Sequence, residues 1–582
     1  MEHLKTRFDI SRFFLVFSLS LFLLGTLTKL SIPLAEWDYV YIDAAQQWAQ
    51  GINKEWRIDH PPLYPFFLTI LFKFFGSNVI VARLGNIFCI LLTGLVLFRM
   101  TSILCNRDAA FWTITFYFLS PVCIQGVLSM DVADTSILPL AFVFTTYAII
   151  NNTLHPCLKN TGILSLGVGF CFWVKVTSTI ALISSILGCI IFYLIIYRKE
   201  RTRYKGWLLN ICGIVAGLLF FLLTWVFVSY SLWGREACIS VLQAPWYTLL
   251  SQNAVKMNAA HKIIQVIRDS ILLFVWLSPY FIITWIYGSL ALVKLTYKNA
   301  SDQVHIIFLL AGVCVFYFTG YLLLGGTNYG FPRYHAALLP LMCIFVGTHV
   351  STFILEMDNK ARIVLNMSLL FLILFFIIFS KDPLYFLNMQ LKEMLLSNVS
   401  FESLAKHSLF IFLLLYVLPI IISTSIANFF QNIHKHRVLV ICLFLGSLST
   451  MISLNIQHLV APYRTSTEYG ANGKIELIHL VRNYIQDGDY ILATPEFTYD
   501  LRDRKIPYIG WQVWGSRENI YEFILNKKPS AVIAGITVNT YEQLKWLSTD
   551  TQGTLIKDYA FERIGTYYLW IRKSAMNHGI VG

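Results

Sequence analysis

Apolar runs of about 20 residues recur along most of the chain and alternate with short polar loops. A helix needs about 20 mainly apolar residues to cross the hydrocarbon core of a bilayer. The pattern therefore predicts a polytopic α-helical membrane protein with about thirteen transmembrane helices. We place these spans at residues 11–32, 78–104, 109–127, 132–151, 160–175, 176–197, 207–233, 269–295, 304–325, 334–356, 363–380, 408–430 and 437–456. The two around Lys175 could instead form one broken element.

Basic loops support this count. The stretch MEHLKTRFDISR precedes the first span, YRKERTRYKG follows the sixth, and further basic loops follow the eighth, tenth and twelfth. All of them fall on one side of the membrane, which the positive-inside rule assigns to the cytoplasm. We therefore expect a cytoplasmic N-terminus, an external first loop at 33–77, and an external C-terminus.

The first external loop shows helical patterns of its own. Residues 39–49 place Tyr41, Ala44, Ala45 and Trp48 on one face, which is typical of a helix lying along a membrane surface. The stretch HPPLYPFFLTILFKFFG begins with prolines suited to a first helical turn and ends with a glycine suited to a helix C-terminus. We interpret it as a second interfacial helix, because an extra span would invert every later loop.

The pattern changes after residue 456. The transmembrane domain therefore spans 1–456, and residues 457–582 form a C-terminal extracytoplasmic α/β domain. Helical spacing indicates an apolar stripe of Ile475, Leu477, Ile478, Val481 and Ile485. Two more amphipathic helices are predicted in SRENIYEFILNKK and TYEQLKWLSTD, and strands in DYILAT, SAVIAG and YYLWIRK.

Composition and charge agree with a membrane protein. Hydrophobic residues make up 57% of the chain and charged residues only 13%, about half of what soluble domains carry. The net charge of +13 is spread over short loops, so it indicates membrane orientation and no nucleic-acid partner. Cysteines occur singly and none follows Cys442, which excludes a disulfide framework.

Candidate chemistry gathers at the external ends of the predicted spans. Ionisable residues at membrane depth are functional candidates by default. The carboxylates Glu36 and Asp38 lie in the first external loop, and Asp131 and Asp134 lie in SMDVADTS. The other candidates are cationic or hydrogen-bonding residues: His60, Lys175, Arg333 and Tyr334.

Each candidate also has a purely structural interpretation. Asp131 or Asp134 could cap the helix that follows, since acidic residues favour helix N-termini. Arg333 could extend to lipid headgroups, although basic residues are disfavoured on the external side. Lys175 could mark a boundary between spans. His60 stands before two prolines, where a histidine is more often structural than catalytic.

The order of these stretches resembles a known family. DYVYIDAAQQWAQG followed by DHPPLYPFFLTILFKFFG, then LSPVCIQGVLSMDVADTSILPL, then PRYHAALLPLM, is similar to polyprenyl-phosphate-sugar-dependent glycosyltransferases with the GT-C fold. The nearest groups are protein mannosyltransferase-like enzymes and lipid A aminoarabinose transferases. The resemblance covers the membrane part in order and also the arrangement of spans followed by an outer domain.

The resemblance implies roles for the candidates. An acidic residue of the first external loop is the catalytic base in that family, which implies Asp38 here, with Glu36 as the alternative because Trp37 splits the usual acidic pair. Asp131 or Asp134 matches a second acidic site. His60 matches a contact to the donor phosphate, and Arg333 with Tyr334 matches the site that holds the lipid phosphate. Lys175 could add a further cation.

These observations predict an integral-membrane inverting glycosyltransferase of the cell envelope, moving a hexosyl or pentosyl group. The donor is a polyprenyl-phosphate sugar, the acceptor a lipid, glycan or protein, and the location the plasma (inner) membrane. We expect no cofactor. Asp38 with Asp131 or Asp134 could share a divalent metal, but cationic side chains can meet the charge of a monophosphate donor.

Three other functions are compatible with parts of the pattern. A transporter or flippase for lipid-linked sugars would also place charges at the membrane, although the sequence shows no internal repeat and its charges cluster at one interface. A polysaccharide polymerase or ligase would use related chemistry on a larger donor. A noncatalytic scaffold would leave the external carboxylates and cations unexplained.

Overall fold

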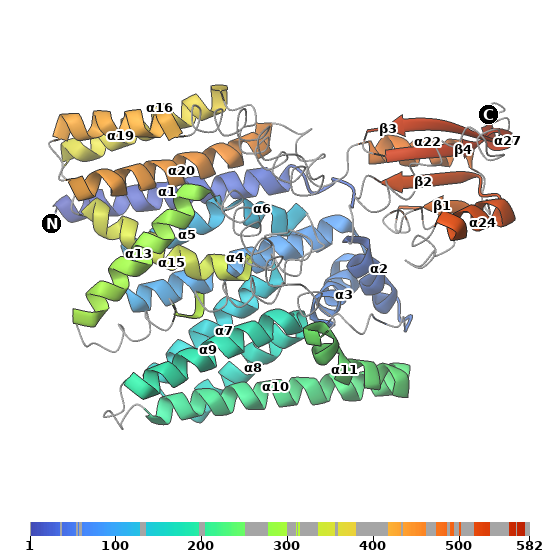
Figure 1. The fold of residues 1–582 in the computed structure, drawn as a ribbon, viewed down its shortest axis with the longest axis horizontal. Helices are drawn as coiled ribbons and strands as arrows, with labels where there is room; N and C mark the ends of the chain where they lie inside the picture. The colour runs from blue at the N-terminus through green and yellow to red at the C-terminus, as the bar shows by residue number, and fades with distance from the viewer. Residues whose placement is uncertain are drawn as a thin grey trace.

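The structure is a computed structural model of the 582-residue chain. It describes residues 2–34, 38–53, 56, 61–128, 136–196, 204–250, 278–298, 310, 312–314, 336–355, 359–379, 417–431, 435–460, 473–485, 489–493, 497, 500–501, 517–535, 558–565 and 567–576. These residues form a body of long helices and a smaller sheet domain (Figure 1).

The helical body contains most of the described chain. Its helices are α1 (Glu2–Leu27), α2 (Asp38–Ala49), α3 (Leu63–Phe75), α4 (Val79–Leu104), α5 (Arg107–Leu119), α6 (Pro121–Leu128), α7 (Ile137–Leu154), α8 (Leu158–Val174), α9 (Val176–Ile196), α10 (Tyr204–Trp233), α11 (Arg235–Leu250), α13 (Pro279–Lys298), α15 (Leu339–Leu355), α16 (Asn359–Phe379), α19 (Leu418–Gln431) and α20 (Lys435–Val460).

Several of these helices can cross a membrane. Within the described residues, six are long and apolar enough, or seven if α5 and α6 together count as one bent span. Shorter apolar helices add to them, among them α3 and α8. The structure therefore describes a multi-pass membrane protein. Most of the predicted span 304–325 lies outside the described residues.

The predicted span 109–127 is not one straight helix. It consists of α5 and α6, which meet at a bend of 62°. Ser120 between them is extended, with φ −67° and ψ 133°. A residue before a proline is disfavoured in the helical region, and Pro121 then opens the next helix. The side-chain amide of Asn455 on α20 donates to the Leu119 carbonyl over 2.7 Å, which satisfies a group that the bend leaves free.

Close helix contacts hold the body together around α5. A Cβ atom added to Gly347 on α15 would lie 2.4 Å from the backbone nitrogen of Thr113 on α5. A Cβ atom at Gly94 on α4 would lie 2.8 Å from the ring of Phe118. In membrane helices, small residues at contacts let backbones approach, and packing supplies the association energy.

A few buried polar pairs also join helices. The Asn152 side-chain amide on α7 donates to the Asn210 side-chain oxygen on α10 over 2.9 Å. On the other side of the body, Thr284 of α13 and Ser447 of α20 share a hydroxyl hydrogen bond of 3.1 Å. Such pairs satisfy polar atoms that have no water nearby and select one helix arrangement.

The C-terminal domain is built on a four-stranded sheet. Its strands are β1 (Ile491–Ala493), β2 (Ala531–Gly535), β3 (Tyr559–Ile564) and β4 (Tyr567–Arg572), in the order β1-β2-β4-β3. The pair β1 and β2 is parallel, whereas the other two pairs are antiparallel. Helices α22 (Lys474–Tyr484), α24 (Arg517–Lys527) and α27 (Lys573–Met576) accompany the sheet.

This domain has its own apolar core. Leu477 and Val481 of α22 pack with the inward residues of β1, β2 and β4 in a cluster separate from that of the helices. Figure 1 shows the domain at one end of the helical body, at the same end as α2 and α3, with the N-terminus at the opposite end.

Candidate functional site

Helix α2 begins at Asp38, the residue that we predict to be the catalytic base. Ile42, Ala44 and Ala45 are buried against the rest of the body, and α2 packs along α3. The side chain of Asp38 and the whole of Glu36 lie outside the described atoms. The structure therefore gives the backbone position of the expected base, at the N-terminus of a helix whose inner face is fixed by packing.

The far end of α2 is tied to the junction of α10 and α11. The rings of Trp48 and Trp233 stack with centroids 6.3 Å apart. Asn53 donates its side-chain amide to the Leu232 carbonyl and accepts from the Trp233 indole, each over 3.1 Å. Gly234 between the two helices has φ +87°, which a residue with a Cβ rarely adopts. This end of the predicted first external loop, residues 33–77, is thus held by aromatic contacts and hydrogen bonds.

Helix α3 is anchored to α4 beneath α2. The Tyr64 hydroxyl is buried and donates to the Asn86 side-chain oxygen over 2.9 Å. A Cβ atom at Gly85 would lie 2.5 Å from the side chain of Leu71, so the two helices approach closely. Gly76 follows α3 with φ +87°, in agreement with its predicted place at the helix C-terminus.

Asp43 on α2 forms hydrogen bonds within its own helix. Its carboxylate accepts from the Gln47 side-chain amide, one turn later, over 3.1 and 3.2 Å. Contacts at this spacing stabilise a helix. Asp43 is therefore a suitable reference for Asp38, since both carboxylates lie on the same helix.

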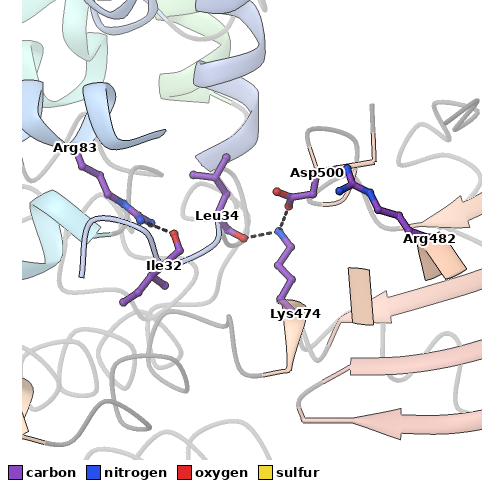
Figure 2. A network of polar contacts seen from close by, with 6 residues as sticks. All are labelled: Ile32, Leu34, Arg83, Lys474, Arg482 and Asp500. Carbon is purple, nitrogen blue, oxygen red and sulfur yellow. Dashed lines mark hydrogen bonds and ion pairs between the residues drawn. The ribbon is translucent and has the colours of Figure 1, made fainter. Parts of the chain in front are cut away.

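A short segment, residues 28–34, connects α1 with the first external loop; we call it the linker. Arg83 of α4 donates Nη1 to the Leu30 carbonyl over 2.7 Å. The same nitrogen also donates to the Ile32 carbonyl (Figure 2). The Arg83 side chain is 0% exposed. A guanidinium presents several donors in a fixed plane, so one side chain can hold several carbonyls at once.

Arg83 also reaches the second acidic segment. Its Nη2 donates to the carbonyl of Leu128, the last residue of α6, over 3.2 Å. Leu128 stands three residues before Asp131, and the linker ends four residues before Asp38. One buried arginine thus joins the chain segments that lead to both predicted acidic sites. Arg83 is absent from the residues predicted above to form the site, although an arginine inside an apolar span is a signal of function.

Lys175 lies between α8 and α9, and it is half-buried. Its backbone is extended, with φ −158° and ψ 113°. Its N–H donates to the Cys171 carbonyl over 2.9 Å, and its carbonyl accepts from the Thr179 hydroxyl over 2.8 Å. The single non-helical residue separates two helices, so two elements meet here. A role in phosphate binding stays a prediction.

Six predicted site residues lie outside the described residues: Glu36, His60, Asp131, Asp134, Arg333 and Tyr334. Their roles in the site stay predictions. Among the residues that the structure does describe, no group of three His, Cys, Asp or Glu side chains is placed to hold a metal.

Comparison with solved structures identifies the class of the fold. ArnT from Cupriavidus metallidurans bound to undecaprenyl phosphate matches with a TM-score of 0.54 at 12% identity, over 96% of this chain and 97% of that one. The apo form of the same protein matches with a TM-score of 0.53 at 10% identity, over the same shares. The oligosaccharyltransferase of Archaeoglobus fulgidus in complex with Zn and sulfate matches with a TM-score of 0.50 at 11% identity, over 95% and 71%.

These matches confirm the class of the predicted fold: the chain is a helical, multi-pass membrane protein with the GT-C fold. The number of thirteen spans stays a prediction. Residues 59–227 match the family described as dolichyl-phosphate-mannose-protein mannosyltransferase, which confirms the resemblance seen in the sequence. That segment runs from the middle of the first external loop into α10. A search of curated proteins finds no match to the chain.

Proposed function

We propose that this protein is an integral-membrane inverting glycosyltransferase. It moves a sugar from a polyprenyl-phosphate donor to an acceptor on the extracytoplasmic side of a plasma membrane. The main support is that nearly the whole chain follows the fold of ArnT, a protein solved with undecaprenyl phosphate bound, while residues 59–227 match a mannosyltransferase family. The C-terminal α/β domain, which we call the outer domain after its predicted location, falls within that match together with the helical body.

The proposed reaction is a single displacement. A hydroxyl oxygen of the acceptor attacks the anomeric carbon as the bond from that carbon to the phosphate oxygen breaks. The acceptor proton passes to a carboxylate, and polyprenyl phosphate leaves with the electron pair of the broken bond. Asp38 is the proposed base, because it opens a helix whose buried face and two flanking segments are fixed by the described contacts.

The proposed donor site uses cations for the leaving phosphate. Arg333 with Tyr334, His60 and Lys175 are the proposed contacts, since a guanidinium can hold phosphate oxygens bidentately and the other donors add charge or hydrogen bonds. Asp131 or Asp134 is the proposed second acidic site and would orient the acceptor. Either a hexose or a pentose fits this chemistry, so donors that carry each kind of sugar belong in the assay.

The direct test is a donor-consumption assay. The purified full-length protein in lipid nanodiscs is supplied with polyprenyl-phosphate hexoses and pentoses and with lipid, glycan and peptide acceptors. Release of polyprenyl phosphate together with inversion at the anomeric carbon supports the proposal. Absence of release with every donor, alongside sugar movement across proteoliposomes, would show that the protein is a transporter instead.

Variants on one helix test the identity of the base. Asp38→Asn should lower kcat by about 10²–10⁴-fold, because a positioned general base contributes that much. Asp43→Asn is the matched control and should keep wild-type kcat, since the Asp43 carboxylate accepts from the Gln47 side-chain amide one turn along the same helix. If Glu36→Gln abolishes turnover while Asp38→Asn does not, the base is Glu36.

The same assay tests metal dependence. We expect turnover to survive prolonged chelation, because cationic side chains can stabilise the charge of a monophosphate leaving group. Loss of turnover on chelation, with recovery on adding one divalent metal, would contradict this expectation and point to Asp38 and its acidic partner as ligands.

A further inference from the structure

The outer domain reaches the linker through one lysine. Lys474 is the first residue of α22, and its side chain is 0% exposed. Its Nζ donates to the Leu34 carbonyl over 2.5 Å, at the last described residue of the linker (Figure 2). Leu34 itself is 1% exposed. Residues 440 positions apart in the sequence therefore meet in a contact that is closed to solvent.

The ammonium group is neutralised on the side of the outer domain. Asp500 Oδ2 lies 2.7 Å from Nζ, and the ring of Phe497 lies under the ammonium with its centroid 5.0 Å away. A buried charge without a partner is strongly unfavourable, so the ion pair allows the lysine to be buried at all. Asp500 and Phe497 hold the ammonium, while the Leu34 carbonyl is its contact to the helical body.

The backbone around Lys474 is also fixed. Gly473 precedes it with φ +83°, and a Cβ atom there would lie 2.6 Å from the Ile564 carbonyl at the end of β3. The turn between β3 and β4 therefore packs directly against the start of α22. The position of the lysine follows from the fold of the whole outer domain and not from a flexible tail.

The contact is close in sequence to the expected base. Leu34 precedes Asp38 by four residues, and Arg83 holds the same linker at Leu30 and Ile32 from inside the helical body. Figure 2 shows the two cations reaching the linker from different sides. Arg83 fixes the middle of the linker, and Lys474 fixes its end.

We propose that Lys474 is a positioning residue for the reaction: by holding the Leu34 carbonyl, it couples the docked outer domain to the N-terminus of α2 and so to Asp38. This inference rests on the proposed function. It gives the outer domain a part in catalysis that does not require the domain to touch the donor. Correct docking of the domain sets the position of the base.

The test uses the full-length protein and three substitutions. Lys474→Met removes the donor and should lower kcat by about 10- to 100-fold, because small displacements of a reacting group cost this much. The KM for the donor should change by less than about twofold, since the proposed phosphate contacts lie elsewhere. Lys474→Arg keeps a cationic donor and should recover most of the lost kcat.

Arg482 supplies the matched control. It lies on the same helix, is exposed, and donates to the backbone carbonyl of Asp500 over 2.9 Å, on the side of its own domain. Arg482→Met should keep wild-type kcat. An equal loss in Arg482→Met and Lys474→Met would overturn the inference, because it would show a general weakening of the outer domain.

Hydrogen exchange separates this inference from the proposed function. Lys474→Met should speed amide exchange in residues 38–42, at the start of α2, and leave exchange in α4 unchanged. Should Lys474→Met not fold, Asp500→Asn takes its place, with a smaller increase expected because the ammonium remains. If the wild-type protein releases no polyprenyl phosphate, the proposed function fails, but the exchange result still decides whether Lys474 orders α2. Wild-type exchange at the start of α2 in Lys474→Met, or in Asp500→Asn where that variant replaces it, overturns the inference.

Discussion

The helical body and the outer domain each bury one cationic side chain against the linker, but they do so differently. Arg83 donates to carbonyls in two segments of the helical body. Lys474 donates to one carbonyl of the body and pairs with a carboxylate of its own domain. The arginine joins parts of one core, whereas the lysine joins two regions with separate cores.

We therefore expect removal of the Arg83 side chain and removal of the Lys474 side chain to have different consequences. A fork of donors that holds three carbonyls inside a helix bundle contributes to folding of the bundle. A lysine at the junction of two separately packed regions contributes little to either core, and it controls how one region meets the other. We therefore expect loss of Arg83 to affect stability first and loss of Lys474 to affect geometry first.

Arg83→Met should produce the largest effect on stability. It leaves the carbonyls of Leu30, Ile32 and Leu128 without this donor, and a buried unsatisfied polar group costs about 1–3 kcal/mol. We expect the free energy of unfolding to fall by at least about 3 kcal/mol, measured by denaturant titration in detergent micelles. Arg99→Met is the control, because Arg99 lies on the same helix and is exposed. A change below about 1 kcal/mol in Arg83→Met would show that the contact is dispensable.

Gly347→Ala tests the close packing of the body. The new methyl group would meet the Thr113 backbone at 2.4 Å, and overpacking of this kind costs about 1–3 kcal/mol. Thermal unfolding followed by gel filtration should show a lower unfolding temperature for Gly347→Ala. Gly162→Ala on α8 is the control, since a Cβ atom there meets nothing within 4 Å. Equal stability of the two variants would mean that α5 and α15 can move apart freely.

Gly473→Ala tests the corresponding position in the outer domain. The left-handed conformation costs a residue with a Cβ about 1–2 kcal/mol, and the contact with the Ile564 carbonyl adds to that cost. Proteolysis should cleave the outer domain faster and leave the helical body intact. Gly76→Ala isolates the cost of the left-handed conformation, since Gly76 has φ +87° and a Cβ atom there meets nothing within 4 Å. A loss of stability in the helical body would contradict the separation of the two cores.

Tyr559→Phe should produce the smallest effect. The Tyr559 hydroxyl donates to the Pro529 carbonyl over 2.6 Å, and such a bond contributes about 0.5–1.5 kcal/mol. Burial raises the pKa of this hydroxyl from 10.0 to about 12, although Arg572 opposes the rise. Because the pKa is higher in the folded protein than in the unfolded chain, the protonated hydroxyl makes its full contribution to stability below about pH 10. That contribution is lost as the pH rises from about 10 to about 12. The stability difference between wild type and Tyr559→Phe should therefore shrink across that range.

Hydrophobic length alone indicates most of the helices, because a bilayer demands long apolar segments with internal hydrogen bonds. The break within the span 109–127 was also open to prediction, since Ser120 stands before Pro121. The apolar run continues unbroken across the proline, however, and hydrophobic length therefore predicts one straight span there. Strand β3 is not predicted from the sequence, because it has no apolar run and much of it is exposed.

Helix α22 shows where a pattern misleads. The predicted apolar stripe includes Ile475, yet Ile475 is 51% exposed while Lys474 beside it is fully buried. A lysine at the start of an amphipathic helix usually indicates a solvated position. Here the contact with the linker and the ion pair with Asp500 bury it, and both partners are distant in the sequence.

The sequence by itself determined the class of protein, the run of helices, and the order of the short stretches that resemble GT-C enzymes. These features depend on local composition and on hydrophobic length, which a chain carries without its fold. Only the tertiary structure decided that Arg83 and Lys474 hold the same linker before Asp38. Those contacts join residues tens to hundreds of positions apart, and no local pattern encodes which distant carbonyl a buried cation will meet.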